Sequence, residues 1–163
     1  MPTPAKQIVA RSLRWRWLQR LMLMGIHIFV PRHRVGIAVV VLNGEGQILL
    51  LEHVFHPYVR WGLPGGWLNR DEQPAAGAAR ELREETGMEV EMGPVIHLEQ
   101  EVAPRHLNIA YLARVLPGSR APVRLSGEII SAGWFAPDRL PTPLLPFTRN
   151  AIDAALRVEW EAA

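Results

Sequence analysis

The sequence contains no cysteine among its 163 residues. The chain therefore has no thiol nucleophile, no thiolate metal site and no redox-sensing thiol. It also lacks the bias of a disordered, collagenous or disulfide-rich protein, because 48% of its residues are hydrophobic and 21% are charged. A chain of this length and composition is expected to form one domain with a sizeable core.

Acidic residues are absent from positions 1–34. The same segment carries seven basic residues, which are Lys6, Arg11, Arg14, Arg16, Arg20, Arg32 and Arg34. Positions 35–163 hold 11 basic and 16 acidic residues and therefore carry a net charge of −5. A basic arm on an acidic body predicts either an anionic partner for the arm or packing of the arm on the body.

A long hydrophobic run is also missing. The apolar stretch at 21–30 has only ten residues, which is too short to span a bilayer. Pro31, Arg32, His33 and Arg34 follow it in place of a small-residue cleavage site, so we do not expect a secretory signal. The resulting prediction is a cytoplasmic protein.

The arm is predicted to contain a helix over 5–24, because Val9, Leu13, Trp17 and Leu21 recur every four residues. We expect this helix to pack on the domain or on the second copy of a homodimer. Two alternatives stay open. A basic helix with interleaved tryptophans also suits an anionic membrane surface or RNA.

Periodicity in the rest of the chain predicts a mixture of strands and helices. Strands are predicted at 35–42, 47–52, 89–92, 95–101, 107–116 and 129–135, and helices at 73–86 and 148–161. A turn at 43–46 joins the first two strands as a hairpin, and 53–64 is predicted to be a loop. The expected architecture is an α/β domain at 34–163, with a mixed sheet between helices, preceded by a helical extension at 1–33.

The helix at 73–86 gathers three carboxylates on one side. At about 100° per residue, Glu81, Glu84 and Glu85 fall within one sector of about 100°. The face expected to be buried consists of Ala75, Ala78, Ala79, Leu82 and Thr86. Three neighbouring carboxylates indicate either a solvated acidic face or a site for a hard divalent cation such as Mg²⁺ or Mn²⁺. Helix geometry alone leaves both interpretations open.

The wider spacing of this segment is more specific. Pro74 suits the start of a helix, Asp71 and Glu72 suit its positive end, and Gly87 suits its left-handed cap. The fixed positions are Gly66, Glu72, Arg80, Glu81, Leu82, Glu84, Glu85, Gly87 and Met88. At these positions the segment resembles the signature box of the Nudix hydrolases. The resemblance covers 66–88 closely and leaves the first 30 or so residues outside.

The resemblance implies a fold, a reaction and residue roles. The fold is an α/β/α sandwich with a mixed sheet, and the reaction is hydrolysis of a nucleoside diphosphate linked to another group, with Mg²⁺ or Mn²⁺ as cofactor. Metal ligands would be Glu81, Glu84, Glu85 and the carbonyl of Gly65. Arg80 would orient a glutamate by an ion pair, and Gly66, Glu72 and Gly87 would shape the loop–helix–loop. The general base is implied to be either Glu81 or Glu128.

Substrate contacts are predicted for Arg60, Trp61, Trp67 and Trp134, which flank the segment and could hold phosphate or stack on a base. Core packing is the ordinary alternative for such aromatic residues. Candidate substrates are a nucleoside triphosphate, ADP-ribose or a nucleotide sugar. The alternatives are hydrolysis at an RNA 5′ end with the arm binding the polyanion, a non-catalytic nucleotide-binding module, and an isoprenyl diphosphate isomerase, which would need a cysteine.

Overall fold

The computed structural model describes residues 16–29, 33–55, 58–102, 105–116 and 124–160. The chain divides into two compact units, Met1–Arg32 and His33–Ala163. The first unit contains helix α2, Arg16–Phe29. Helix α2 covers 16–24 of the helix predicted at 5–24 and continues to Phe29, while positions 5–15 of that prediction lie outside the described residues. Within the described residues, no helix has both the length and the apolar content needed to cross a bilayer.

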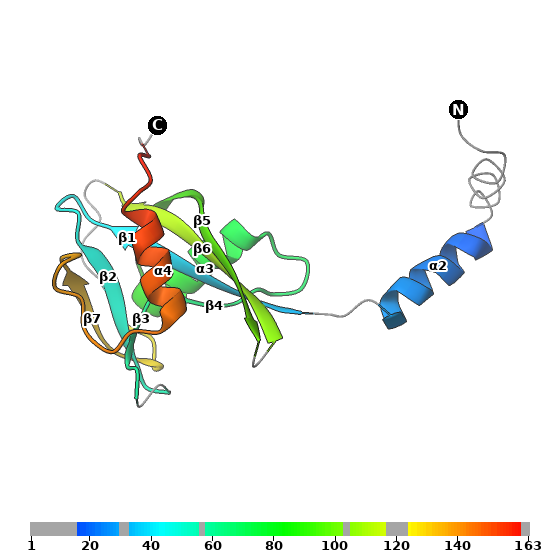
Figure 1. The fold of residues 1–163 in the computed structure, drawn as a ribbon, viewed down its shortest axis with the longest axis horizontal. Helices are drawn as coiled ribbons and strands as arrows, with labels where there is room; N and C mark the ends of the chain where they lie inside the picture. Colours follow the sequence, from blue (N-terminus) through cyan, green and yellow to red (C-terminus); the bar gives the residue numbers. More distant parts are fainter. Residues whose placement is uncertain (1–15, 30–32, 56–57, 103–104, 117–123, 161–163) are drawn as a thin grey trace. The chain divides into compact units, whose positions relative to one another are not determined.

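The second unit is built on a seven-stranded mixed sheet (Figure 1). The strands are β1 Arg34–Leu42, β2 Ile48–His53, β3 Trp61–Gly62, β4 Gly65–Trp67, β5 Val90–Val102, β6 Arg105–Val115 and β7 Ile129–Phe135. The main order is β3-β2-β1-β6-β5, with β4 paired to β1 and β7 paired to β2. The pairing of β1 with β6 is parallel, whereas β2 and β4 run antiparallel to β1.

Strand β1 has side chains in both cores of the unit. Val39 and Val41 point to the core that contains Leu82 of helix α3, Pro74–Thr86. Val40 points to the opposite core, which contains Ile152 of helix α4, Pro146–Ala155. Burial on both faces explains why β1 is a continuous apolar run. Helices on opposite faces of a mixed sheet form the expected α/β/α sandwich (Figure 1).

Several predicted boundaries were wrong. The two strands expected at 89–92 and 95–101 form one strand, β5, with register shifts between Met92 and Val95 and between Val95 and His97. The loop expected at 53–64 contains β3. The closing helix begins at Pro146 and ends at Ala155 instead of covering 148–161. A β-bulge keeps both halves of β5 paired with β6, which a sequence pattern of period two cannot reveal.

Helix α3 matches its predicted span and differs in detail. Ala78, Leu82 and Thr86 are buried as expected, whereas Ala75 is exposed. The helix has no acidic residue in its first turn, because it starts at Pro74, after Asp71 and Glu72. Gly87 ends the helix with φ of 70°, the left-handed cap that glycine adopts without steric cost. The helix therefore starts and stops at fixed points, and its carboxylates have defined positions.

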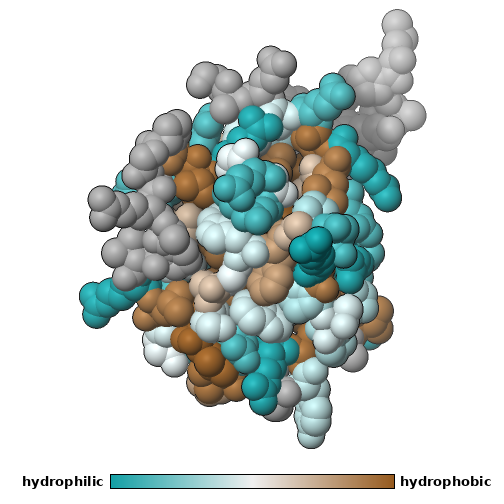
Figure 2. Space-filling model, turned by 90° about the vertical axis from the view of Figure 1, so that its left-hand side faces the viewer, coloured by the Kyte–Doolittle hydropathy of each residue, from teal (hydrophilic) through white to brown (hydrophobic). Residues whose placement is uncertain are grey.

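The surface of the second unit is mixed in polarity. Seen from the side of β2 and β7, hydrophilic and apolar side chains alternate across the face (Figure 2). Exposed apolar side chains come from separate elements of the unit, including Phe55 before β3, Leu98 on β5 and Ile130 on β7.

Candidate active site

A cleft of about 1000 Å³ is lined by strands of the sheet, by helix α3, by the start of helix α4 and by the loop before β7. Three of its lining carboxylates come from α3, which are Glu81, Glu84 and Glu85. Glu128, just before β7, lines the same cleft. Because α3 packs on β1 through its apolar side, the carboxylates at its edge open towards this cavity. The structure thus brings together the four acidic residues that the sequence analysis singled out.

Arg80 holds the acidic side of α3 in one arrangement. Its Nε and Nη2 donate to both carboxylate oxygens of Glu72, at 2.8 and 3.0 Å. Its Nη1 donates to Glu81 at 2.9 Å and to Glu84 at 3.2 Å. A planar guanidinium suits several directed bonds of this kind, which a lysine could not reproduce. Arg80 therefore ties the loop before the helix to two of the candidate metal ligands.

Glu72 is the anchor of this arrangement. The ion pair with Arg80 and a hydrogen bond donated by the Asn69 main-chain N–H lower the pKa of Glu72 from 4.5 to about 2. Arg80 in turn has its pKa raised, chiefly by Glu72. The pair fixes the loop at 69–73 against the helix, as its predicted structural role requires.

Glu85 has a different environment. Its side chain is buried, and burial raises its pKa from 4.5 to about 8. One oxygen accepts a 2.9 Å hydrogen bond from the Gly65 N–H, which opposes the rise, and the charges of Glu81, Glu128 and Glu84 add to it. A buried carboxylate surrounded by like charges is the environment in which a cation stabilises the ionised form.

The two glycines at the start of β4, Gly65 and Gly66, lie in close contact with β1 and with the Glu81 side chain of α3. A Cβ on Gly66 would lie 2.5 to 2.7 Å from the carboxylate atoms of Glu81. A Cβ on Gly65 would meet the carbonyl oxygen of Ile37 on β1. Position 65 therefore needs glycine because main-chain atoms leave no room for a side chain, whereas a side chain at position 66 would displace the Glu81 carboxylate.

The loop that carries Glu128 is tied to the end of α3. The Ser126 N–H donates to the Glu85 carbonyl at 3.1 Å, and the Arg124 N–H donates to the Thr86 carbonyl at 3.4 Å. The Glu128 carbonyl accepts from the Val54 N–H at 2.9 Å. These main-chain bonds bring a residue far along the sequence to the same cleft as the helix carboxylates.

The donor set fits a hard divalent cation. All the candidate ligands present oxygen, which Mg²⁺ and Mn²⁺ prefer over nitrogen or sulfur. Among the described residues, no three Asp, Glu or His side chains are arranged so that together they could hold a metal ion. The Glu81 and Glu84 carboxylates accept hydrogen bonds from Arg80, whereas the Glu85 carboxylate accepts one from the Gly65 N–H.

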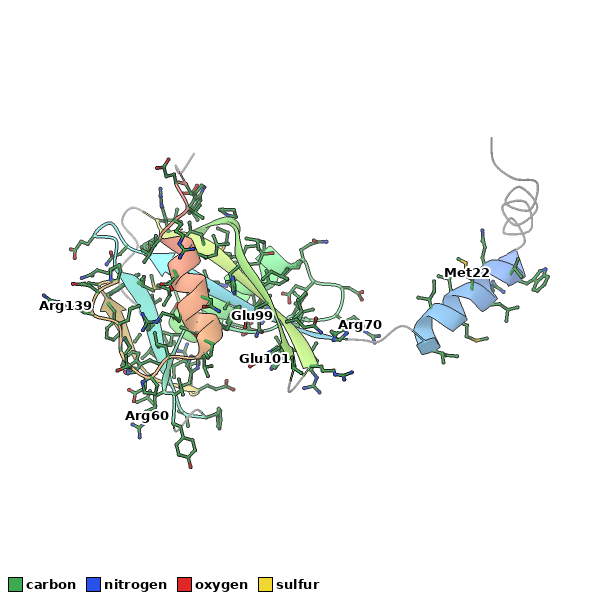
Figure 3. The ribbon with its side chains drawn as sticks, in the orientation of Figure 1. Met22, Arg60, Arg70, Glu99, Glu101 and Arg139 are labelled. Atoms are coloured by element: carbon green, nitrogen blue, oxygen red, sulfur yellow. The ribbon has the colours of Figure 1, made fainter. Side chains whose placement is uncertain are left out.

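The residues predicted to touch substrate separate into two pairs. Trp61 and Trp67 line the cleft, with Trp67 half exposed and Trp61 packed edge-on against Phe135. Arg60 does not line the cleft; it points outward and pairs with Glu52 at 3.4 Å (Figure 3). Trp134 packs against the core on the α3 side of the sheet and does not line the cleft either.

The cleft has a second polar wall that the sequence patterns did not predict. It consists of Glu99 and Glu101 on β5 (Figure 3) and His106 and Asn108 on β6. His106 Nε2 lies 2.7 Å from the Glu101 carboxylate, and the His106 ring contacts Trp67 edge-on at 5.3 Å. The polar residues recur at every second position on two strands, which is the signal that places them on one face of a sheet.

Comparisons with known proteins find the same family by sequence and by structure. Residues 32–155 match the family model described as NUDIX domain. A MutT-like protein of Streptomyces ambofaciens is 31% identical over 110 residues, which is 68% of each chain. An RNA pyrophosphohydrolase of Roseobacter denitrificans is 31% identical over 75 residues, 46% of this chain and 47% of that one. The crystal structure of a MutT NUDIX hydrolase from Burkholderia pseudomallei superposes with a TM-score of 0.64 at 30% identity, covering 76% of this chain and 98% of that one.

Proposed function

The chain belongs to the Nudix hydrolase family, and from that premise we propose that it is a Mg²⁺-dependent pyrophosphohydrolase. Its substrate is a nucleoside diphosphate linked to another group, in the class of nucleoside triphosphates, ADP-ribose and nucleotide sugars. Mn²⁺ is expected to replace Mg²⁺, because both are hard cations that accept oxygen ligands.

One observation carries this proposal. Glu81, Glu84 and Glu85 of α3 line a cleft together with Glu128, and the only side-chain cation hydrogen-bonded to the helix carboxylates in the described residues is Arg80. A diphosphate is itself an anion and is repelled by such a wall. The cleft can therefore bind it only when a cation lies between the carboxylates and the phosphates.

The metal site is assigned to the carboxylates of Glu81, Glu84 and Glu85 and the carbonyl of Gly65. When bound, Mg²⁺ neutralises phosphate charge and lowers the pKa of a water molecule. Glu81 or Glu128 then accepts the proton of the attacking water at a carboxylate oxygen. The new P–O bond forms as the bridging P–O bond of the anhydride breaks, and the two products each keep a terminal phosphate. Arg80 keeps Glu81 oriented through its 2.9 Å bond.

The remainder of the cleft is assigned to the nucleoside. Trp67 is half exposed at the edge of the cleft and offers a flat surface for stacking a base. Glu99, Glu101 and Asn108 offer hydrogen-bond acceptors and an amide to ribose hydroxyls and base edges.

Phosphate release across a substrate panel tests the proposal. The panel contains nucleoside triphosphates, ADP-ribose, nucleotide sugars, dinucleotides and 5′-triphosphate RNA, each with Mg²⁺ and a coupled phosphatase or pyrophosphatase. The blank is Glu85→Gln, and the matched control is Glu89→Gln, which changes an exposed carboxylate that does not line the cleft. Turnover of one small-nucleotide class by the wild type and Glu89→Gln, absent in Glu85→Gln, supports the proposal.

Two results would favour the alternatives. Turnover confined to 5′-triphosphate RNA, with affinity falling steeply as salt rises, would assign the activity named for the Roseobacter relative. Binding of nucleotides without turnover of any, by protein that melts cooperatively, would assign a nucleotide-binding module.

A further inference from the structure

Helix α2 has an unusually wide apolar face. At 100° per residue, seven apolar residues span about 200° of its circumference, which are Trp17, Leu18, Leu21, Met22, Met24, Ile26 and Ile28. The remaining sector holds Arg16, Gln19, Arg20, Leu23 and His27. A helix that packs on a protein surface needs a stripe of only about 100°. Docking α2 on one side of a protein would leave close to half of its apolar face in water.

Charge around the helix has one sign. Positions 1–34 carry seven basic residues and no acidic one. Arg14 and Arg16 lie before Trp17, and Arg32 and Arg34 follow the apolar stretch at 21–30. Two arms packed side by side in a dimer would bring fourteen positive charges together without a counter-charge. An anionic partner removes this repulsion.

The described members of both hydrophobic cores lie in the second unit. The family match begins at residue 32, and 76% of this chain covers 98% of the Burkholderia structure. The apolar face of α2 is therefore additional to what the domain needs for its own core.

We infer that α2 lies in the surface of an anionic lipid bilayer and holds the catalytic domain there. Fourteen residues give a helix of about 21 Å, shorter than the hydrocarbon thickness of about 30 Å, so the helix lies along the bilayer plane. Its wide apolar face enters the boundary between headgroups and acyl chains, while Arg20 and the flanking arginines meet lipid phosphates. The net charge of −5 on positions 35–163 keeps the body away from the same surface.

Vesicle sedimentation with the full chain tests the inference. The probes are vesicles of phosphatidylcholine alone and vesicles of phosphatidylcholine with about 30% phosphatidylglycerol. We expect at least about tenfold tighter binding to the anionic vesicles at low salt, and loss of most of that preference at about 0.5 M salt. Equal binding to both vesicle types, or none to either, overturns the inference.

Two leucines of α2 provide a matched pair of variants. Leu21→Glu places a carboxylate inside the apolar face, whereas Leu23→Glu makes the same change in the polar sector. Both add one negative charge, so their difference reports contact with the apolar part of the bilayer. We expect Leu21→Glu to bind anionic vesicles about tenfold more weakly than Leu23→Glu. The melting temperature of the domain should be unchanged in both variants.

Other outcomes identify other partners and overturn the lipid assignment. If the two variants weaken vesicle binding equally, the added negative charge explains the loss and α2 does not enter the apolar part of the bilayer. A lower melting temperature in Leu21→Glu would show that α2 packs on the domain. A dimer that Leu21→Glu dissociates, without vesicle binding, would show that α2 contacts a second copy. Binding of a single-stranded RNA in place of vesicles would assign the arm to nucleic acid.

Discussion

The Gly65 N–H donates a 2.9 Å hydrogen bond to the Glu85 carboxylate. The bond joins the first residue of β4 to the last turn of α3, so the sheet positions a carboxylate that the helix alone would leave free to rotate. Gly65 pairs with Ala38 on β1 at the same time. The central strand, the glycine loop and the acidic helix are therefore linked through two residues.

Removing the charge of Glu85 should abolish most of the activity. Glu85→Gln keeps the size of the side chain and its capacity to accept the Gly65 hydrogen bond, and it loses one charged metal ligand. Changes at residues that only support metal ligands cost about 10- to 100-fold, so we expect a loss of about 100-fold or more. The measurement is Mg²⁺-dependent phosphate release, with circular dichroism to verify folding. Wild-type turnover in a folded Glu85→Gln protein would refute the metal assignment.

A methyl group at Gly66 should displace Glu81. In Gly66→Ala the new Cβ would stand 2.5 to 2.7 Å from the Glu81 carboxylate atoms, so that carboxylate has to move. We expect turnover to fall about tenfold or more while the protein still folds, because the clashing atoms are the end of a flexible side chain. Gly44→Ala is the matched control, since nothing lies within 4 Å of its added Cβ. Equal activity of the two variants would count against the role given to Glu81.

The Glu72–Arg80 pair should make stability depend on acidity. The folded-state pKa of Glu72, about 2, lies below its ordinary value of 4.5. The stabilisation is therefore fully present above pH 4.5 and is lost as the pH falls towards 2. Urea unfolding of wild type and Glu72→Gln should show a difference in the free energy of unfolding that is constant near neutral pH and narrows below pH 4.5. A difference that does not change with pH would mean that the pair contributes nothing through charge.

Divalent cations should stabilise the folded protein. A ligand that binds only the folded state at about 100 times its Kd adds about 2.7 kcal/mol. We expect Mg²⁺ and Mn²⁺ to raise the melting temperature of the wild type and to have a much smaller effect on a Glu84→Gln, Glu85→Gln double variant. Thermal melts with and without millimolar metal measure this. A melting temperature that does not respond to either cation would contradict the proposed site.

Deletion of residues 1–32 should leave a folded, active domain. Every described member of the two hydrophobic cores belongs to the second unit, so we expect the domain to fold without the arm. We expect unchanged turnover of small nucleotides, an unchanged melting temperature and no binding to anionic vesicles. Insoluble or unfolded truncated protein would show that the arm completes the core or a dimer.

Local patterns predicted the elements that depend on local chemistry. Pro74 and Gly87 mark the two ends of α3, and the apolar runs at 35–42 and 129–135 lie within β1 and β7. The α/β/α fold followed from the resemblance at 66–88 and is confirmed. Capping residues at α3 and burial of β1 on both faces leave a direct trace in the sequence.

Features that depend on tertiary contacts were not predictable in the same way. Glu85 and Glu84 are neighbours on the acidic side of α3, yet one is buried and the other is exposed. Glu85 accepts a hydrogen bond from the Gly65 N–H, and Gly65 is held there by its pairing with Ala38 of β1. The polar wall of Glu99 and His106 likewise depends on the register of β5 on β6, which two shifts alter. Register is set by the whole sheet rather than by either strand.

The parallel pairing of β1 with β6 also sets an order of assembly during synthesis. Each residue of β1, from Arg34 to Leu42, pairs with a residue 72 positions further along the chain, from His106 to Arg114. Helix α3 lies between the two strands in sequence and can form from local interactions, whereas the long-range pairing has to wait for β6. A nascent chain that ends before Arg105 therefore contains every residue of 66–88 and still lacks the strand that carries His106 and Asn108 to the cleft.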